Sequence, residues 1–209
     1  MSRAFCYQCH RAKVACLCGR IEKQPNEIKI IILQHPDEVN NPKGTGIIAE
    51  LGLQHHQKWV SEDFSKHEAL INFITENRAE TAILYPTEGA NVISKEKTGL
   101  ENLKLKNLIV IDATWRKAKK MWALQPLFHD MTCLRLTNEQ ISNYRIRKVP
   151  KDGHLSTIES VVVALRVLEG KQQAYQSLIS LFTEMINFQI NQMGEDTYKK
   201  NYENKIDKK

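Results

Sequence analysis

The stretch Leu108-Ile109-Val110-Ile111-Asp112-Ala113-Thr114-Trp115 passes from a continuous apolar run directly into polar and aromatic residues. The apolar run is β-branched or aliphatic and too short for a helix, so it predicts a buried strand. The following segment, to about residue 124, carries four basic residues and is predicted to be helical. A strand that leads through a short loop into a helix is typical of parallel sheets with helical connections.

The same order of elements recurs on both sides of this stretch. Apolar runs predict further strands at residues 27–35, 81–84 and 134–136, with a short strand at 58–60. Helices are predicted at residues 44–53, 65–78, 156–169 and 171–193. Ser65 with Glu68, and Ser156 with Glu159, match the capping box that opens a helix. The alternation predicts an α/β fold, with a mostly parallel sheet covered by helices on both faces.

Three of the predicted strands end in loops of unusual composition. These loops are Gln34-His35-Pro36, Tyr85-Pro86-Thr87-Glu88-Gly89 and Asp112-Ala113-Thr114-Trp115. The carboxyl ends of parallel strands share one edge of the sheet, and ligands of open α/β sheets bind there. We therefore expect the functional site at this edge.

Length and composition limit the classes of protein that the chain can represent. With 209 residues, 42% of them hydrophobic and 26% charged, it fits one globular domain with room for a small appendage. Its longest purely apolar runs, at residues 30–33 and 161–165, are far shorter than the ~20 residues that span a bilayer. No membrane span is expected. The first residues lack the apolar segment of a secretory signal, so we expect a reducing cytoplasm.

The formal net charge of +6 is unevenly distributed. Residues 1–25 and 197–209 are both rich in lysine and arginine. Basic ends suggest a polyanionic partner, although solvated charge that only aids solubility explains them equally well.

Four of the five cysteines lie within the first eighteen residues, as Cys6-x-x-Cys9 and Cys16-x-Cys18. Two close thiol pairs can surround zinc tetrahedrally, with His10 as a possible substitute ligand. Redox chemistry and unliganded thiols are the alternatives, but no strand precedes the first pair as a thioredoxin-type motif would require. We expect Cys133 to be a small buried hydrophobic residue.

Six motifs follow one another along the chain: Cys6-x-x-Cys9 with Cys16-x-Cys18, Gln34-His35-Pro36-x-Glu38 leading into Lys43-Gly44-Thr45, Tyr85-Pro86, Asp112-x-Thr114-Trp115, Arg145-x-Arg147, and Leu155-Ser156-Thr157-x-Glu159. Taken in this order they resemble one family, the DTW-domain tRNA-uridine aminocarboxypropyltransferases. The resemblance implies transfer of the 3-amino-3-carboxypropyl group of S-adenosylmethionine to N3 of a tRNA uridine, releasing methylthioadenosine. It also implies a SPOUT-like knotted C-terminal part.

On this basis we divide the chain into three parts. Residues 1–25 form a zinc-knuckle segment, residues 26–196 the α/β catalytic domain, and residues 197–209 a basic tail that we expect to be frayed. The expected partner is tRNA, and no protein partner is evident.

Asp112 is the predicted catalytic base for the proton on uridine N3. An ordinary aspartate has a pKa of about 3.9, so this role requires desolvation. Orientation of a ligand, or capping of the following helix, are the alternatives.

The residues expected to bind S-adenosylmethionine lie in the strand-end loops and in the second capping box. They are Pro36, Tyr85, Pro86, Thr87, Asp112, Thr114, Trp115, Ser156, Thr157 and Glu159. Trp115 can stack on a base or wedge its helix onto the sheet, and Thr114 can bind the cofactor or assist a cap. For Ser156 and Glu159 the alternatives are a role near the cofactor and a purely structural cap, and for His35 they are loop structure and contact with substrate.

Basic residues after Trp115 and around Pro150 are expected to contact RNA phosphates. They are Arg116, Lys117, Lys120, Arg145, Arg147, Lys148 and Lys151. The zinc site, closed by four thiolates, would then help docking or folding and not catalysis. The alternative functions are a SPOUT-type RNA methyltransferase and a non-catalytic zinc-ribbon RNA-binding protein.

Overall fold

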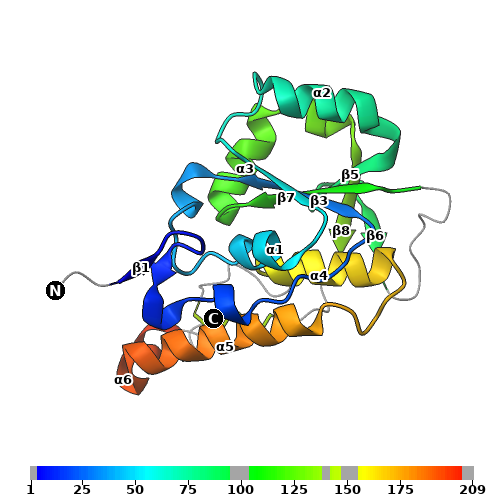
Figure 1. Cartoon of the computed structure of the whole chain (residues 1–209). Helices are drawn as coiled ribbons and strands as arrows, with labels where there is room; N and C mark the ends of the chain where they lie inside the picture. Colours follow the sequence, from blue (N-terminus) through cyan, green and yellow to red (C-terminus); the bar gives the residue numbers. More distant parts are fainter. Residues whose placement is uncertain (1–3, 95–103, 138–141, 147–154, 204–209) are drawn as a thin grey trace.

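A computed structural model describes residues 4–94, 104–137, 142–146 and 155–203. Its centre is a six-stranded sheet with helices on both sides (Figure 1). The strands are β3 (Lys29–Gln34), β4 (His56–Val60), β5 (Thr81–Leu84), β6 (Asn91–Ile93), β7 (Asn107–Asp112) and β8 (Thr132–Leu136). They lie in the order β4-β3-β7-β5-β8-β6, and every pairing is parallel. The predicted α/β fold with a parallel sheet is confirmed.

Two groups of helices cover the sheet, as alternation along buried strands requires. The α-helices are α1 (Gly46–Gly52), α2 (Glu68–Asn77), α3 (Trp115–Leu124), α4 (Thr157–Leu168), α5 (Gln176–Met193) and α6 (Glu195–Tyr198). Ile30 and Ile32 of β3 pack in one core with α1, α4 and α5, whereas Ile31 and Leu33 pack in a second core with α2 and α3. Figure 1 shows these two layers below and above the sheet.

The helical connections switch from one face of the sheet to the other between β3 and β7, and a crevice forms at such a reversal point. These strands are neighbours, but the helix after β3, α1, lies on one face and the helix after β7, α3, on the other. Open α/β sheets bind ligands where adjacent strands send their connections to opposite faces. Gln34 and Asp112, the last residues of the two strands, are register partners at this point.

The N-terminal segment forms a small unit of its own beside the sheet. It consists of the two-stranded sheet β1 (Phe5–Cys6) and β2 (Arg11–Ala12), followed by the short helices η1 (Lys13–Ala15) and η2 (Cys18–Arg20). The other short helices are η3 (Pro36–Glu38), η4 (Arg78–Glu80), η5 (Pro126–Asp130) and the π-helical η6 (Lys199–Glu203). Residues 197–203, the described part of the predicted basic tail, are helical and not frayed: they lie in α6 and η6, which follow α5.

Some local predictions differ from the structure. The first capping box is wrong, because α2 begins at Glu68 and its N-cap is His67, whose Nδ1 accepts the N–H of Leu70 at 3.2 Å. The last long helix begins at Gln176 and not at residue 171, because Tyr175 adopts a left-handed φ of 63°. Strand β6 went unpredicted because it has only three residues and lies at the sheet edge.

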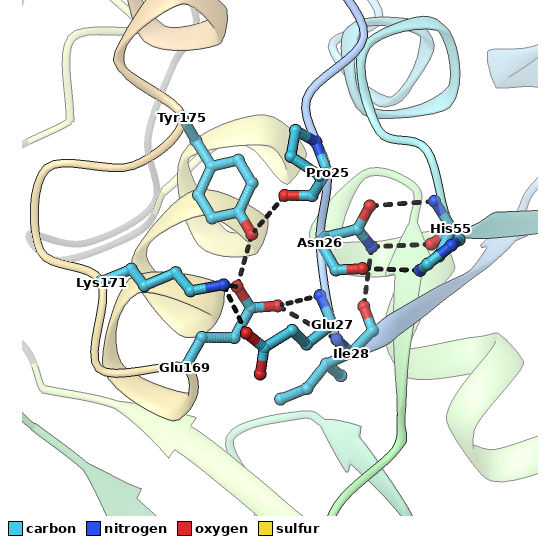
Figure 2. A network of polar contacts seen from close by, with 8 residues as sticks. All are labelled: Pro25, Asn26, Glu27, Ile28, His55, Glu169, Lys171 and Tyr175. Atoms are coloured by element: carbon cyan, nitrogen blue, oxygen red, sulfur yellow. Dashed lines mark hydrogen bonds and ion pairs between the residues drawn. The ribbon is translucent and has the colours of Figure 1, made fainter.

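A buried carboxylate joins the amino edge of the sheet to the turn between α4 and α5 (Figure 2). Glu169 accepts the backbone N–H groups of Glu27 and Ile28 at 2.8 and 3.0 Å, and the Tyr175 hydroxyl at 2.5 Å. Lys171 lies 3.7 Å from the same carboxylate. Main-chain donors at the start of β3 are thereby tied to the C-terminal helices.

No helix in the described part of the chain has both the length and the apolar character that crossing a membrane requires.

Candidate active site and cysteine centre

Asp112 lies at the carboxyl edge of the sheet, where three elements meet. Its side chain is buried, with 5% of the residue surface exposed. The Gln34 amide donates to its Oδ2 at 2.7 Å, and the Thr157 hydroxyl donates to its Oδ1 at 2.6 Å. Strands β3 and β7 and the first turn of α4 therefore converge on one carboxylate.

Asp112 is not the cap of the helix that follows it. The N-cap of α3 is Thr114, and its side chain makes no capping hydrogen bond. The cap-only interpretation of Asp112 therefore fails, while its roles toward proton or ligand stay open. Trp115, the first residue of α3, is half-buried.

A glycine-containing loop of residues 43–46, the glycine loop, packs against Asp112. A Cβ atom on Gly46 would lie 2.4 Å from Asp112 Oδ2, so only glycine fits there without a shift. Thr45 Oγ1 accepts the N–H of Ile158 at 3.5 Å, and the Tyr144 hydroxyl donates to the Lys43 carbonyl. The loop is thus held by α4 and by the segment that precedes it.

The capping box at the start of α4 is confirmed. Ser156 accepts from the Glu159 N–H, and the Glu159 carboxylate accepts the N–H of Ser156 at 2.8 Å. The same carboxylate accepts the Asn143 N–H at 2.6 Å and the Ser142 hydroxyl at 2.8 Å. Glu159 thus fixes both the helix start and the 142–144 segment, which favours a structural role.

Tyr85 lies on the other face of the sheet from the Asp112 carboxylate. Its ring stacks on Trp122 with centroids 4.2 Å apart, and burial raises the pKa of its hydroxyl. Next to this pair is a cavity of about 360 Å³. Its lining includes Thr87 and Trp122. Among the residues expected at the cofactor, Asp112, Ser156, Thr157 and Glu159 therefore gather at one place, and Tyr85 and Thr87 at another.

His35 is buried in the loop after β3, and its two ring nitrogens contact that loop and the segment after β4. Its Nδ1 accepts the Asp37 N–H at 3.1 Å, and its Nε2 lies 3.1 Å from the Glu62 carboxylate. These contacts support the loop-structure interpretation. Pro36, which follows, is exposed in η3.

The predicted RNA-binding residues have different surroundings. Lys117 lies 3.0 Å from Asp37, and Lys120 lies 2.6 Å from Glu62. Hydrogen bonds from these lysines lower the pKa of both carboxyl groups. Arg116 and Arg145 are exposed, and Arg145 also donates to Asn187. Arg147, Lys148 and Lys151 lie outside the described residues.

Cys6, Cys9, Cys16 and Cys18 form a compact cluster that can hold a metal ion. Their sulfurs all lie within 4.8 Å of one another, with Cys6 to Cys18 and Cys9 to Cys16 each at 3.7 Å. Thiolates at ~2.3 Å from a tetrahedral zinc ion are about 3.8 Å apart, so the cluster has the dimensions of such a site. Cys133 is half-buried, and burial raises its pKa.

The four thiols do not ionise alike. The backbone N–H groups of Cys9 and Gln8 point at the Cys6 sulfur and lower its pKa to about 6. Burial and the neighbouring sulfurs of Cys6 and Cys9 raise the pKa of Cys18. Four adjacent thiolates repel one another, and a divalent cation would remove that repulsion.

Sequence reasoning missed three residues that build this region. Gln34 was expected at the end of the strand and the start of its loop, but not as a site residue, and the observed register puts it beside Asp112. Gly46 and Arg11 carried no local signal, because their importance comes from tertiary contacts.

Comparisons with known proteins agree on one family. The family model of the DTW domain matches residues 3–190. The tRNA-uridine aminocarboxypropyltransferase 2 of Drosophila melanogaster is 30% identical over 198 residues, covering 90% of this chain and 76% of that protein. The mouse protein of the same name is 28% identical, covering 96% and 68%, and tRNA-uridine aminocarboxypropyltransferase A of Arabidopsis thaliana is 26% identical, covering 90% and 81%. No solved structure matches significantly.

Because the DTW model extends over nearly the whole chain, from the cysteine cluster to α5, this protein belongs to the DTW-domain family.

Proposed function

We propose that this protein transfers the 3-amino-3-carboxypropyl group of S-adenosylmethionine to N3 of a uridine in tRNA and releases methylthioadenosine. Membership of the DTW family and the names of the relatives support this reaction. The observation that carries it at the level of residues is the buried Asp112, held by Gln34 and Thr157 at the reversal point of the sheet.

In this reaction the N3–H bond of uridine breaks and its proton passes to Asp112. The nitrogen electron pair forms the new bond to the aminocarboxypropyl carbon, the carbon–sulfur bond breaks, and its electrons neutralise the sulfonium. A base must lie within hydrogen-bond reach of the proton that it removes. The Thr157 hydroxyl can rotate away from Oδ1, whereas the Gln34 amide keeps the carboxylate in place.

S-adenosylmethionine is proposed to bind along the strand-end loops, next to Asp112. The proposed contacts on the side of the Asp112 carboxylate are Pro36, Thr114, Trp115, Ser156, Thr157 and Glu159. Tyr85, Pro86 and Thr87, of which Tyr85 and Thr87 lie apart from this group, are proposed contacts for a second part of the ligand. Thr157 and Trp115 are the strongest candidates, since Thr157 contacts Asp112 and Trp115 opens α3 at the same edge. Ser156 and Glu159 would act through the backbone that they hold.

Zinc is proposed as a structural ion bound by Cys6, Cys9, Cys16 and Cys18. A closed site of four thiolates has no open coordination position, so the ion would stabilise the N-terminal segment. The three-part division at residues 25 and 196 and the SPOUT-like knotted C-terminal part also remain proposals. A reducing cytoplasm also remains a proposal, in which zinc-bound thiolates and an unpaired Cys133 would persist.

RNA binding is proposed for the basic residues beyond β7 and before α4. Arg116 and Arg145 are exposed and suited to phosphate contact, whereas Lys117 and Lys120 would have to exchange carboxylate partners for phosphate. Binding through phosphates weakens linearly in a plot of log affinity against log salt. An affinity for tRNA that does not change with salt would contradict this assignment.

Product analysis tests the proposed reaction against the rival methyl transfer. The purified protein is incubated with S-adenosylmethionine and unmodified tRNA, and the nucleoside products are identified by mass spectrometry. Methylthioadenosine with aminocarboxypropyluridine supports the proposal, whereas S-adenosylhomocysteine with a methylated base establishes methyl transfer. Absence of S-adenosylmethionine binding in calorimetry would favour the non-catalytic RNA-binding alternative.

A further inference from the structure

Arg11 is a buried arginine that contacts three separate parts of the chain. Only 2% of its surface is exposed. Its Nη1 donates to the Cys9 carbonyl at 3.0 Å, and its Nη2 donates to the Gly44 carbonyl at 2.8 Å. The same Nη2 lies 3.2 Å from the Met185 sulfur in α5. One guanidinium thus joins the cysteine cluster, the glycine loop and a C-terminal helix.

The Gly44 carbonyl, which accepts from Arg11, lies two residues before Gly46, the residue that packs against Asp112. Gly46 approaches Asp112 Oδ2 so closely that a Cβ would lie 2.4 Å away. Other fixed points of the loop include the bonds of the Lys43 and Gly44 amides to Asn41, the Tyr144 hydroxyl at Lys43, and the contact between Thr45 and α4. Arg11 is therefore the contact by which the cysteine cluster helps to fix the backbone against Asp112.

Burying this guanidinium costs free energy, because its N–H donors lose their hydrogen bonds to water and one of them gains no replacement within the described part of the chain. Among the residues that the structure describes, Arg11 Nε has no hydrogen-bond partner. Hydrogen bonds from a charged donor are roughly twice as strong as neutral ones, and the planar guanidinium donates in fixed directions. A lysine has a single nitrogen and cannot match the positions of Nη1 and Nη2 together.

We propose that Arg11 is a positioning residue. It links the cysteine cluster to the glycine loop and thereby fixes the position of the loop backbone and of Asp112. Its effect on turnover rests on the function proposed above, whereas its effect on the loop does not. The N-terminal segment then contributes to the rate of the reaction as well as to RNA docking. A displacement of about 1 Å at a reacting group can cost on the order of 100-fold in rate.

Steady-state kinetics of Arg11→Gly test the effect on turnover, with Arg20→Ala as the matched control. Arg20 lies in the same segment and pairs with Glu184 of α5, and within the described part of the chain no side-chain hydrogen bond or ion pair joins it to the glycine loop. We expect Arg11→Gly to lower kcat about 10- to 100-fold with KM for tRNA within about twofold, and added guanidinium ion to restore part of kcat. Arg20→Ala should keep both constants.

Three outcomes would overturn the proposal: equal losses in both variants, a loss confined to KM, or a folded Arg11→Gly protein that guanidinium does not rescue. Metal content, measured for each variant, should stay equal to that of the wild type. A drop in metal content of Arg11→Gly alone would also overturn it, because the loss would then lie in the cysteine cluster.

Hydrogen–deuterium exchange without substrate tests the effect on the loop independently of any activity. The more conservative Arg11→Lys is used here, so that folding is preserved if the glycine variant fails. We expect faster exchange at the Gly44 and Ile48 amides, which bond Asn41 and Thr45, and unchanged exchange in β4. Unchanged exchange in the loop would overturn the proposal even if aminocarboxypropyl transfer were established, and faster exchange would uphold it even if that reaction were not found.

Discussion

Asp112 and Glu169 are both buried carboxylates, but they lie at opposite edges of the same sheet and have different partners. Asp112, at the carboxyl edge, accepts from the side chains of Gln34 and Thr157. Glu169, at the amino edge, accepts from two main-chain N–H groups and from the Tyr175 hydroxyl. The Thr157 hydroxyl can rotate when a ligand arrives, whereas the main-chain donors to Glu169 are fixed just before β3.

The surroundings of the two carboxylates strengthen the contrast. Asp112 meets a glycine loop with no side chain between them, at the reversal point where α/β folds bind ligands. Glu169 is covered by the α4–α5 turn and has a lysine partner. We interpret the first as a functional acid and the second as a structural one, and the predictions below separate the two.

Asp112→Asn should have the largest effect on activity. Asparagine retains the size of the side chain but cannot accept the N3 proton, and loss of a general base costs roughly 100- to 10,000-fold in rate. Formation of methylthioadenosine should fall by that factor while the melting temperature stays nearly unchanged. Near-normal turnover would remove Asp112 from the catalytic role.

Gly46→Ala and Gly52→Ala insert the same methyl group at the two ends of α1. At residue 46 the new Cβ meets Asp112, and at residue 52 it meets the buried Leu178 at 2.4 Å. We expect Gly46→Ala to lower kcat at least about tenfold, since misplaced catalytic groups are costly. Gly52→Ala should instead destabilise the fold by about 1–3 kcal/mol through overpacking and retain activity per folded molecule. Urea unfolding and kinetics on both variants check whether one loses activity and the other stability. Equal losses of kcat in the two variants would contradict this prediction.

Glu169→Gln should affect stability and not chemistry. Glutamine can still accept at one oxygen, but its amide group cannot accept from Tyr175 or pair with Lys171. Loss of a buried charged acceptor costs roughly 1–3 kcal/mol of unfolding free energy. Chemical denaturation should show this decrease, with kcat of the folded protein unchanged. A stable but inactive variant would reverse our interpretation of the two carboxylates.

Tyr175→Phe should produce the smallest effect: it removes one hydrogen bond to Glu169, and its distinguishing signature is the pH dependence of stability in alkaline solution. Burial and the Glu169 carboxylate raise the pKa of Tyr175 above its ordinary value of 10.0. The folded state therefore keeps the phenol proton where the unfolded state loses it, and the stability that this contributes is present below pH ~10 and falls as the pH rises further. Denaturation midpoints between pH 8 and 11 should fall less steeply in Tyr175→Phe than in the wild type. Identical slopes would show that Tyr175 does not contribute.

The strands of the sheet were predictable because short-range sequence patterns identify them. Residues 108–111 and 81–84 are apolar runs flanked by turn-forming residues, and such runs need no tertiary information to identify. The location of Asp112 at the carboxyl edge of the sheet followed from the parallel pairing of the strands alone. The register that places Gln34 beside Asp112 was not predictable, since it depends on how two strands 78 residues apart align.

The contacts of Arg11 and Glu169 were hidden for a related reason. Arg11 is one of two lysine or arginine residues between the cysteine pairs, and its sequence neighbours do not reveal that it is buried against Gly44 and Met185. Glu169 meets Glu27 across 142 positions. Charge in a sequence predicts exposure by default, so a buried ion is recognised only once the surrounding elements are placed.

The contact between Arg11 and Met185 joins residues 174 positions apart. The cysteine segment is synthesised long before α5, the helix against which it packs. At about 5–20 residues per second, roughly 10–35 s separate the two on the ribosome. During that time the contact between Arg11 and Met185 is absent, so the four closely spaced thiols of the newly made chain are most sensitive to oxidation before α5 is complete.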